Sequence, residues 1–189
     1  MRIISGKFRG RRFNPPADNW PTRPTTDFAK EGLFNILNNH LDYEELKVLE
    51  LFGGTGNMSY EFLSRGSTSV TYVEKHAAAV AFVKKMAAQL DVEEQLRIFQ
   101  LDVYRFVDLN KEKYDFIFAD PPYDLAGFDS IPAKVLDNEL LADDGWFVLE
   151  HGQLNNFSKH PNCFDVRSYG KTSFAFFKNI KKELVEEGK

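Results

Sequence analysis

Cysteine is almost absent from this 189-residue chain, and long apolar runs are absent altogether. The single cysteine, Cys163, excludes an internal disulfide and is typical of a protein kept in a reducing compartment. No stretch approaches the length of a membrane-spanning helix, and the basic N-terminus lacks the apolar core of a signal peptide. We therefore expect a cytoplasmic protein with no membrane partner. The histidines show no metal-ligand spacing, so we expect no metal site: His40, His76, His151 and His160.

Charge is distributed unevenly along the sequence. The whole chain carries a net charge of −4, yet residues 1–30 contain seven basic and two acidic residues. This asymmetry predicts a basic arm and connector over residues 1–24 on an acidic body, although a solvated tail would have the same composition. Apolar side chains in the arm, with Gly6 and Gly10 at its turns, predict a short β-hairpin. The candidate contacts with nucleic-acid phosphates are Arg2, Lys7, Arg9, Arg11, Arg12 and Arg23.

From residue 46 onwards, apolar strand-like runs alternate with amphipathic stretches. This alternation predicts an α/β fold with a mostly parallel, doubly wound sheet, whose ligands bind at the carboxyl ends of the strands. The expected strands are residues 47–51, 69–73, 96–101, 114–119 and 145–150, followed by an antiparallel hairpin of residues 164–169 and 173–178. The expected helices cover residues 57–65, 76–90 and 131–140, after a helix that opens at Thr25-Thr26-Asp27. We expect one domain over residues 25–180 and a charged tail over residues 181–189.

A glycine-rich turn follows the first strand. Gly53, Gly54 and Gly56 let the backbone pass close beneath a ligand. A dinucleotide fingerprint starting at Gly54 would need glycine where Ser59 stands, and no Walker lysine follows, which excludes a triphosphate cradle. Glu50, inside the strand, disfavours a pyrophosphate by like charge and favours a cationic, amine-bearing ligand.

Acidic residues end the next two strands. Glu74 is placed to accept hydrogen bonds from a ribose diol, the usual role of an acid at this point of a Rossmann-like sheet. Asp102 can accept a hydrogen bond from an adenine amino group. Each acid alone is a weak signal, because acids often flank strands. Together with Glu50 and the glycine turn, they favour S-adenosylmethionine over NAD as the cofactor.

The fourth strand ends in Asp120-Pro121-Pro122-Tyr123. Tandem prolines remove two backbone donors and leave carbonyl acceptors free. Asp120 and the Pro121 carbonyl can then hold the NH2 group of a flat ring while Tyr123 covers its face. The alternative is an ordinary proline turn with a surface tyrosine, and the glycine turn earlier in the chain argues against it. The pattern predicts a site for a flat ring that carries an amine.

These motifs resemble those of a known family. Residues 49–56 are similar to motif I of class I methyltransferases, and residues 120–123 resemble their amino-methylating motif IV. The N-terminal Arg2-Ile3-Ile4-Ser5-Gly6, Arg23-Pro24-Thr25 and residues 30–37 resemble the RsmD family, whose members methylate the exocyclic N2 of a guanine in 16S ribosomal RNA. The resemblance implies a seven-stranded class I methyltransferase sheet with a C-terminal antiparallel hairpin, and the small ribosomal subunit or its RNA as partner.

The expected site residues fall into three groups. For catalysis they are Asp120, Pro121, Pro122 and Tyr123; for the cofactor Glu50, Phe52, Gly53, Gly54, Gly56, Glu74, Asp102 and Asp120; for RNA the basic arm residues and Thr25.

Other functions stay compatible with the sequence. DNA or RNA adenine-N6 methyltransferases share motif IV, but the DNA enzymes generally carry an added recognition domain that this length scarcely accommodates. Methylation of a protein amide fits the Pro-Pro-Tyr motif but leaves the basic arm without a purpose. A non-catalytic RNA-binding assembly factor could retain the fold, although the acids at the strand ends argue against it. The size and polarity of the chain favour a monomer.

Overall fold

Seven strands form one sheet in the part of the chain that the structure, a computed structural model, describes: residues 1–15 and 25–180. The strands are β1 (Lys47–Leu51), β2 (Ser69–Glu74), β3 (Leu96–Gln100), β4 (Tyr114–Ala119), β5 (Leu141–His151), β6 (Cys163–Tyr169) and β7 (Thr172–Phe177). The helices are α1 (Asp27–Leu37), α2 (Asn57–Ser64), α3 (Ala77–Leu90), α4 (Val103–Leu109) and α5 (Ile131–Asp137), with a short 3-10 turn η1 (Phe128–Ser130).

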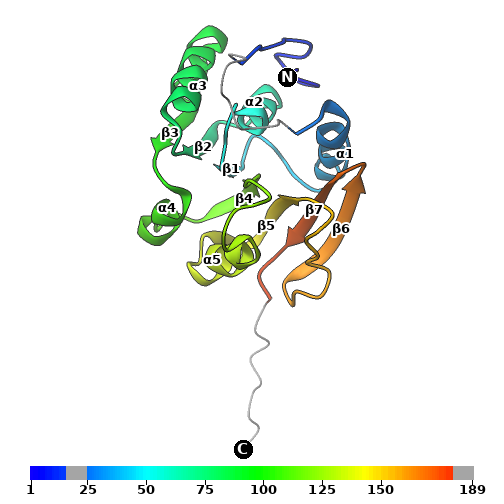
Figure 1. Cartoon of the computed structure of the whole chain (residues 1–189). Coiled ribbons are helices and arrows are strands. Elements are labelled where there is room, and N and C mark those ends of the chain that lie inside the picture. The colour runs from blue at the N-terminus through cyan, green and yellow to red at the C-terminus, as the bar shows by residue number, and fades with distance from the viewer. Residues whose placement is uncertain (16–24, 181–189) are drawn as a thin grey trace, which may run out of the picture.

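The strand order is β3-β2-β1-β4-β5-β7-β6 (Figure 1). The first five strands are parallel, whereas β7 pairs antiparallel with both β5 and β6. The expected class I methyltransferase sheet with a closing antiparallel hairpin is therefore confirmed. The chain moves outward from β1 to β3 and then returns to β4, so the order reverses between β1 and β4. Parallel sheets bind ligands at the carboxyl ends of the strands beside such a reversal.

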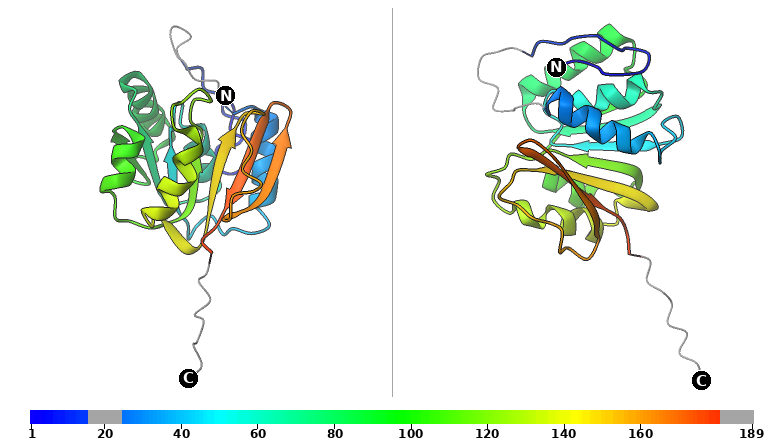
Figure 2. Two further views of the ribbon diagram at one scale, coloured as in Figure 1. Left: turned by 60° about the horizontal axis from the view of Figure 1, so that its bottom comes forward. Right: turned by 90° about the vertical axis from the view of Figure 1, so that its right-hand side faces the viewer.

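Helices cover both faces of the sheet (Figure 2). On one face, apolar side chains of α1, α2 and α3, among them Phe34, Phe62 and Val83, pack in a single core cluster. On the other face, α4 and α5 contribute Phe106 and Val135 to a second cluster. Both faces of the inner strands β1, β2 and β4 are thus buried, which explains why these strands are mostly apolar runs in the sequence, whereas the edge strand β3 is largely exposed.

Two element boundaries show how local chemistry sets the fold. The N-cap of α1 is Thr26, whose hydroxyl accepts from the Ala29 backbone N–H at 3.2 Å, so one of the expected hydroxyls caps the helix. Strand β5 begins at Leu141 rather than at residue 145. An irregularity in the β4–β5 register keeps the polar residues 143–144 exposed within the strand. A pattern search for continuous apolar residues misses such a bulged start.

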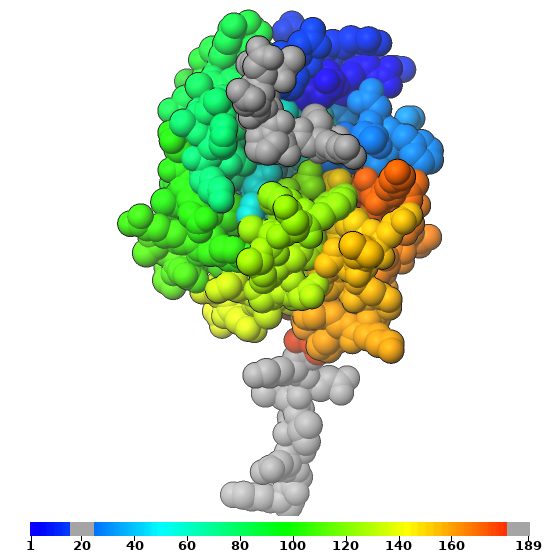
Figure 3. All heavy atoms as spheres, viewed as in Figure 1, coloured from blue at the N-terminus to red at the C-terminus, as the bar shows by residue number. Residues whose placement is uncertain are grey.

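The N-terminal arm folds back onto the body as the expected hairpin, closed by an antiparallel bridge between Arg2 and Arg12. Ile3, Phe8 and Phe13 are buried in the same core cluster as α1, α2 and α3. In the space-filling view the dark blue arm lies at the top right of the molecule, above the lighter blue of α1 (Figure 3). In the described residues, no helix has the length and apolarity that crossing a membrane requires.

Candidate active site

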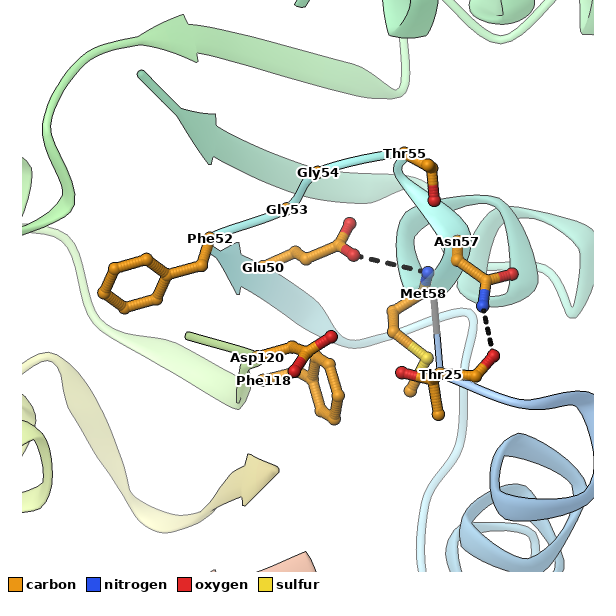
Figure 4. Close-up of a pocket in the computed structure, with 10 residues that line it drawn as sticks. All are labelled: Thr25, Glu50, Phe52, Gly53, Gly54, Thr55, Asn57, Met58, Phe118 and Asp120. Carbon is orange, nitrogen blue, oxygen red and sulfur yellow. Dashed lines mark hydrogen bonds between the residues drawn. The ribbon is translucent and has the colours of Figure 1, made fainter. Parts of the chain in front are cut away.

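A hollow lies at the carboxyl ends of β1 and β4 (Figure 4). We call it the pocket. Its lining residues are Thr25, Glu50, Phe52, Gly53, Gly54, Thr55, Asn57, Met58, Phe118 and Asp120. The structure thus brings most of motif I and the acid of motif IV around one space, at the reversal in strand order where a ligand is expected.

The glycine turn has its shape because of close packing and left-handed backbone. A Cβ on Gly53 would lie 2.3 Å from the Tyr72 ring, so only glycine fits there. The Tyr72 hydroxyl donates to the Gly54 carbonyl at 2.7 Å and holds the turn from below. Phe52 has a left-handed φ of 56°, a strained conformation of the kind found at ligand sites. Gly56, with φ 72°, caps α2 and does not line the pocket.

Glu50 is 3% exposed and points from β1 into the pocket. It accepts hydrogen bonds from the backbone N–H of Met58 at 3.3 Å and of Ser59 at 3.0 Å, and from the Ser59 hydroxyl. Burial raises the pKa of the Glu50 carboxyl to about 7, although these bonds oppose the rise. Ser59, the residue that breaks the dinucleotide fingerprint, is therefore the partner of this acid.

Glu74 and Asp102 lie outside the pocket lining. Glu74 accepts from the Gly54 backbone N–H at 3.1 Å and from the His76 N–H at 2.8 Å, so it holds the turn in place. Asp102 caps α4 by accepting from the N–H groups of Tyr104 and Arg105. Their expected contacts with ribose and adenine stay predictions.

Motif IV leaves the sheet at the pocket. The Asp120 carboxylate lines the pocket and accepts no hydrogen bond from any described residue. Burial, followed by the charges of Glu150 and Glu50, raises the pKa of this carboxyl well above its usual value. Pro121 is buried, whereas Pro122 and Tyr123 are exposed, and none of the three lines the pocket.

Glu150 is a site residue that sequence reasoning missed. It lies one residue before the end of β5, is 3% exposed, and accepts from the Thr25 hydroxyl at 2.6 Å and the Tyr123 hydroxyl at 3.3 Å. Burial raises the pKa of its carboxyl to about 7. The signal was an acid near the end of an otherwise apolar strand, the same pattern that identified Glu50. Thr25, expected to contact RNA, is buried and gives its hydroxyl to this acid.

Glu50, Asp120 and Glu150 are therefore three buried or half-buried acids at the carboxyl ends of β1, β4 and β5. None of the ion pairs among residues 1–15 and 25–180 involves them. Within the same residues, no group of acids, histidines and cysteines has an arrangement that could hold a metal ion. Negative charge that the protein leaves unbalanced attracts an organic cation, or a group that becomes positive during a reaction.

A second buried cluster joins the arm to the pocket wall. Lys30 and Glu61 form an ion pair at 3.2 Å with both side chains fully buried, and Lys30 also donates to Asn57 at 2.8 Å. Asn57 lines the pocket and donates to the Thr25 carbonyl at 3.3 Å (Figure 4). Glu61 accepts from two backbone N–H groups of the arm, those of Ile4 and Ser5. The sequence signal for this cluster was a lysine within the apolar side of α1.

The basic side chains of the arm lie on its surface. Arg2 pairs with Asp27 at 3.1 Å, and Arg11 donates to the Gln89 carbonyl. Lys7, Arg9 and Arg12 are exposed, so they are free to approach an outside partner. Arg23 lies outside the described residues.

A family model described as "Conserved hypothetical protein 95" matches residues 1–178. The chain belongs to this family. Two relatives are named "Ribosomal RNA small subunit methyltransferase D". The Escherichia coli (strain K12) protein is 30% identical over 161 residues, covering 85% of this chain and 79% of the relative. The Haemophilus influenzae protein is 33% identical over 153 residues, covering 79% and 78%. The resemblance to the RsmD family is thereby confirmed.

Solved structures agree with the family. The putative methyltransferase yhhF from Escherichia coli superposes with a TM-score of 0.80 at 26% identity, covering 94% of this chain and 96% of that chain. A hypothetical protein from Thermus thermophilus, TTHA0928, gives a TM-score of 0.81 at 25% identity, covering 95% and 99%. The shared architecture therefore extends over nearly the whole chain.

Proposed function

We propose that this protein transfers a methyl group from S-adenosylmethionine to the exocyclic N2 amine of a guanine in small-subunit ribosomal RNA. The observation that carries the proposal is Asp120, an acid without a protein partner among the described residues, in a pocket walled by the glycine turn. The names of the relatives favour ribosomal RNA as the substrate.

The residues of the pocket suit the cofactor. Gly53 and Gly54 leave room for close approach of a ligand, and Glu50 offers negative charge to a cationic one. When bound, S-adenosylmethionine supplies a methyl group activated by its positive sulfonium. Because the acids of the pocket have no cationic partner among the described residues, they stabilise a positive ligand at no cost in broken ion pairs.

Asp120 and the Pro121 carbonyl act on the base. The lone pair of an exocyclic amine is delocalised into the ring, so the amine is a poor nucleophile. By accepting its two N–H groups, the aspartate and the carbonyl turn the lone pair toward the methyl carbon. As the new N–C bond forms and the methyl–sulfur bond breaks, positive charge builds on nitrogen and Asp120 stabilises it. The proton that nitrogen loses passes to Asp120, whose raised pKa suits this role.

The exposed face of the arm supports an RNA substrate. Lys7, Arg9 and Arg12 carry positive charge on a rigidly docked hairpin, which favours phosphate contacts that set the position of the RNA. A guanine amine is inaccessible in a stacked helix, so the target base is unstacked when it enters the pocket. Tyr123, 46% exposed beside the pocket, offers its ring for stacking.

The test is transfer of a tritiated methyl group to ribosomal RNA, small subunits, DNA and protein in parallel, followed by identification of the modified nucleoside. We expect label in N2-methylguanine of small-subunit RNA. Label in N6-methyladenine, or in DNA or protein, would replace the proposed substrate. An absence of transfer to all four would contradict an enzymatic function.

A further inference from the structure

The Tyr123 ring contacts Glu150, Phe128 and Gly152, and we call these three residues the seat of the ring. Its hydroxyl donates to Glu150 at 3.3 Å, and its edge meets the Phe128 ring at 6.5 Å between centroids. Beneath the ring lies Gly152, where an added Cβ would come within 2.8 Å of the Tyr123 ring carbons. The backbone of Gly152 is not left-handed, so glycine is needed there for close approach of the ring.

Glu150 links this ring to the lining of the pocket. One of its oxygens accepts from Tyr123 and the other from Thr25, which lines the pocket just before α1. Glu150 is 3% exposed and has no cationic partner in the described part of the chain. Burying a charge without a cationic partner lowers the stability of the fold, so the acid at this position is explained by a functional role.

We propose that Glu150 and Gly152 are positioning residues for the methyl transfer, which hold the Tyr123 ring at the angle that stacks on the target base. The inference rests on the proposed function. Glu150 acts through Tyr123 and does not touch the reacting atoms. A carboxylate serves both hydroxyl donors at once, one on each oxygen, whereas an amide has only one acceptor oxygen.

A fixed ring lowers the cost of binding the base. An aromatic side chain that must be ordered on binding subtracts its lost rotamer entropy from the affinity. In the seat, the hydroxyl bond and the contact with Gly152 have already ordered the ring. Loss of the seat should therefore raise KM for RNA and leave kcat and cofactor affinity nearly unchanged.

The test is a double-mutant cycle on methyl transfer with Glu150→Gln, Tyr123→Phe and the double variant. Tyr123→Phe removes the hydroxyl of this bond, whereas Glu150→Gln replaces the carboxylate with an amide that offers one oxygen to two donors. We expect each change to raise KM for RNA about tenfold, since a bond to a charged group is worth that much. The double variant should be no worse than the poorer single one. Glu94→Gln, the same change at an exposed acid, is the control and should match wild type.

Effects that multiply in the double variant would overturn the inference, because Glu150 would then act independently of Tyr123. A second readout needs no activity. Protein labelled with 3-fluorotyrosine gives one fluorine resonance per tyrosine, and the resonance missing in Tyr123→Phe identifies residue 123. We expect that resonance to move in Glu150→Gln and in Gly152→Ala but not in Glu94→Gln. An unmoved resonance would refute the seat even if the protein methylates RNA, whereas a wild type without transfer refutes the proposed function alone.

Discussion

The buried acids near the two ends of α2 differ in whether a cation pairs with them. At its C-terminal end, Glu61 is fully buried and meets the cations of Lys30 and Arg65 together with two backbone N–H groups of the arm. At its N-terminal end, Glu50 faces a pocket that also holds Asp120, and no cation pairs with either in the described residues. Neutralised buried charge is typical of structure, whereas buried charge left unbalanced indicates a site for a ligand.

The largest expected effect is on the rate of methyl transfer, at Asp120, an acid with no cationic partner in the described residues. Asp120→Ala should lower the single-turnover rate of methyl transfer at least about a thousandfold, because the amine loses its acceptor. Affinity for S-adenosylhomocysteine, measured by calorimetry, should change little. The melting temperature should hold or rise, since an uncompensated charge is removed. The neighbouring exposed Asp124→Ala is the control. Full turnover by Asp120→Ala would refute the assigned role.

Removal of a cation that pairs with Glu61 should lower the stability of the protein. Lys30→Met leaves Glu61 buried with one cation fewer and should lower the free energy of unfolding by about 3 kcal/mol in urea titrations. Lys113→Met is the matched control, because its partner Asp143 is exposed at 3.8 Å. The Lys113→Met change should lower the free energy of unfolding by less than about 1 kcal/mol. Equal losses in the two variants would mean that burial of the Lys30–Glu61 pair does not matter.

The smallest of these effects tests the turn that joins β1 to α2. Gly53→Ala drives a Cβ into the Tyr72 ring and should weaken S-adenosylhomocysteine binding about tenfold, a loss comparable to that of one good hydrogen bond. Gly170→Ala is the control: Gly170 has φ +66°, and a Cβ added there would meet no neighbouring side chain or backbone within 4 Å. This change should reduce stability without changing the affinity. Binding unaffected by Gly53→Ala would show that the ligand does not depend on this turn.

The strands, the glycine turn and motif IV could be located from the sequence because their signals are local: apolar runs, glycines and prolines. The apolar residues of the arm likewise predicted a folded hairpin, which buries Ile3, Phe8 and Phe13. Glu150 and Lys30 could not be assigned to a site, because each finds its partners across more than twenty residues of chain. Only the folded sheet brings β5 next to motif IV and places α1 over α2.

The same distinction applies to three residues whose expected ligand contacts stay predictions. Its place in a motif puts Thr25 among the expected RNA contacts, but a motif does not show which way a hydroxyl points. In the fold it donates to Glu150. Glu74 and Asp102 end their strands as expected, yet each uses its carboxylate on nearby backbone N–H groups. Local patterns give positions along the chain, and partners depend on packing.

The most direct test of the account is the number of protons released when ligands bind. Burial holds the pKa of Glu50 and of Glu150 near 7, so a positive ligand should drive protons from these acids. Calorimetry at pH 7 in two buffers of different ionisation enthalpy compares S-adenosylmethionine with S-adenosylhomocysteine, which lacks the sulfonium charge. We predict that S-adenosylmethionine releases more protons, by on the order of half a proton per site. Equal proton release by the two ligands would contradict the claim that the acids without cationic partners form a binding site for a positively charged ligand.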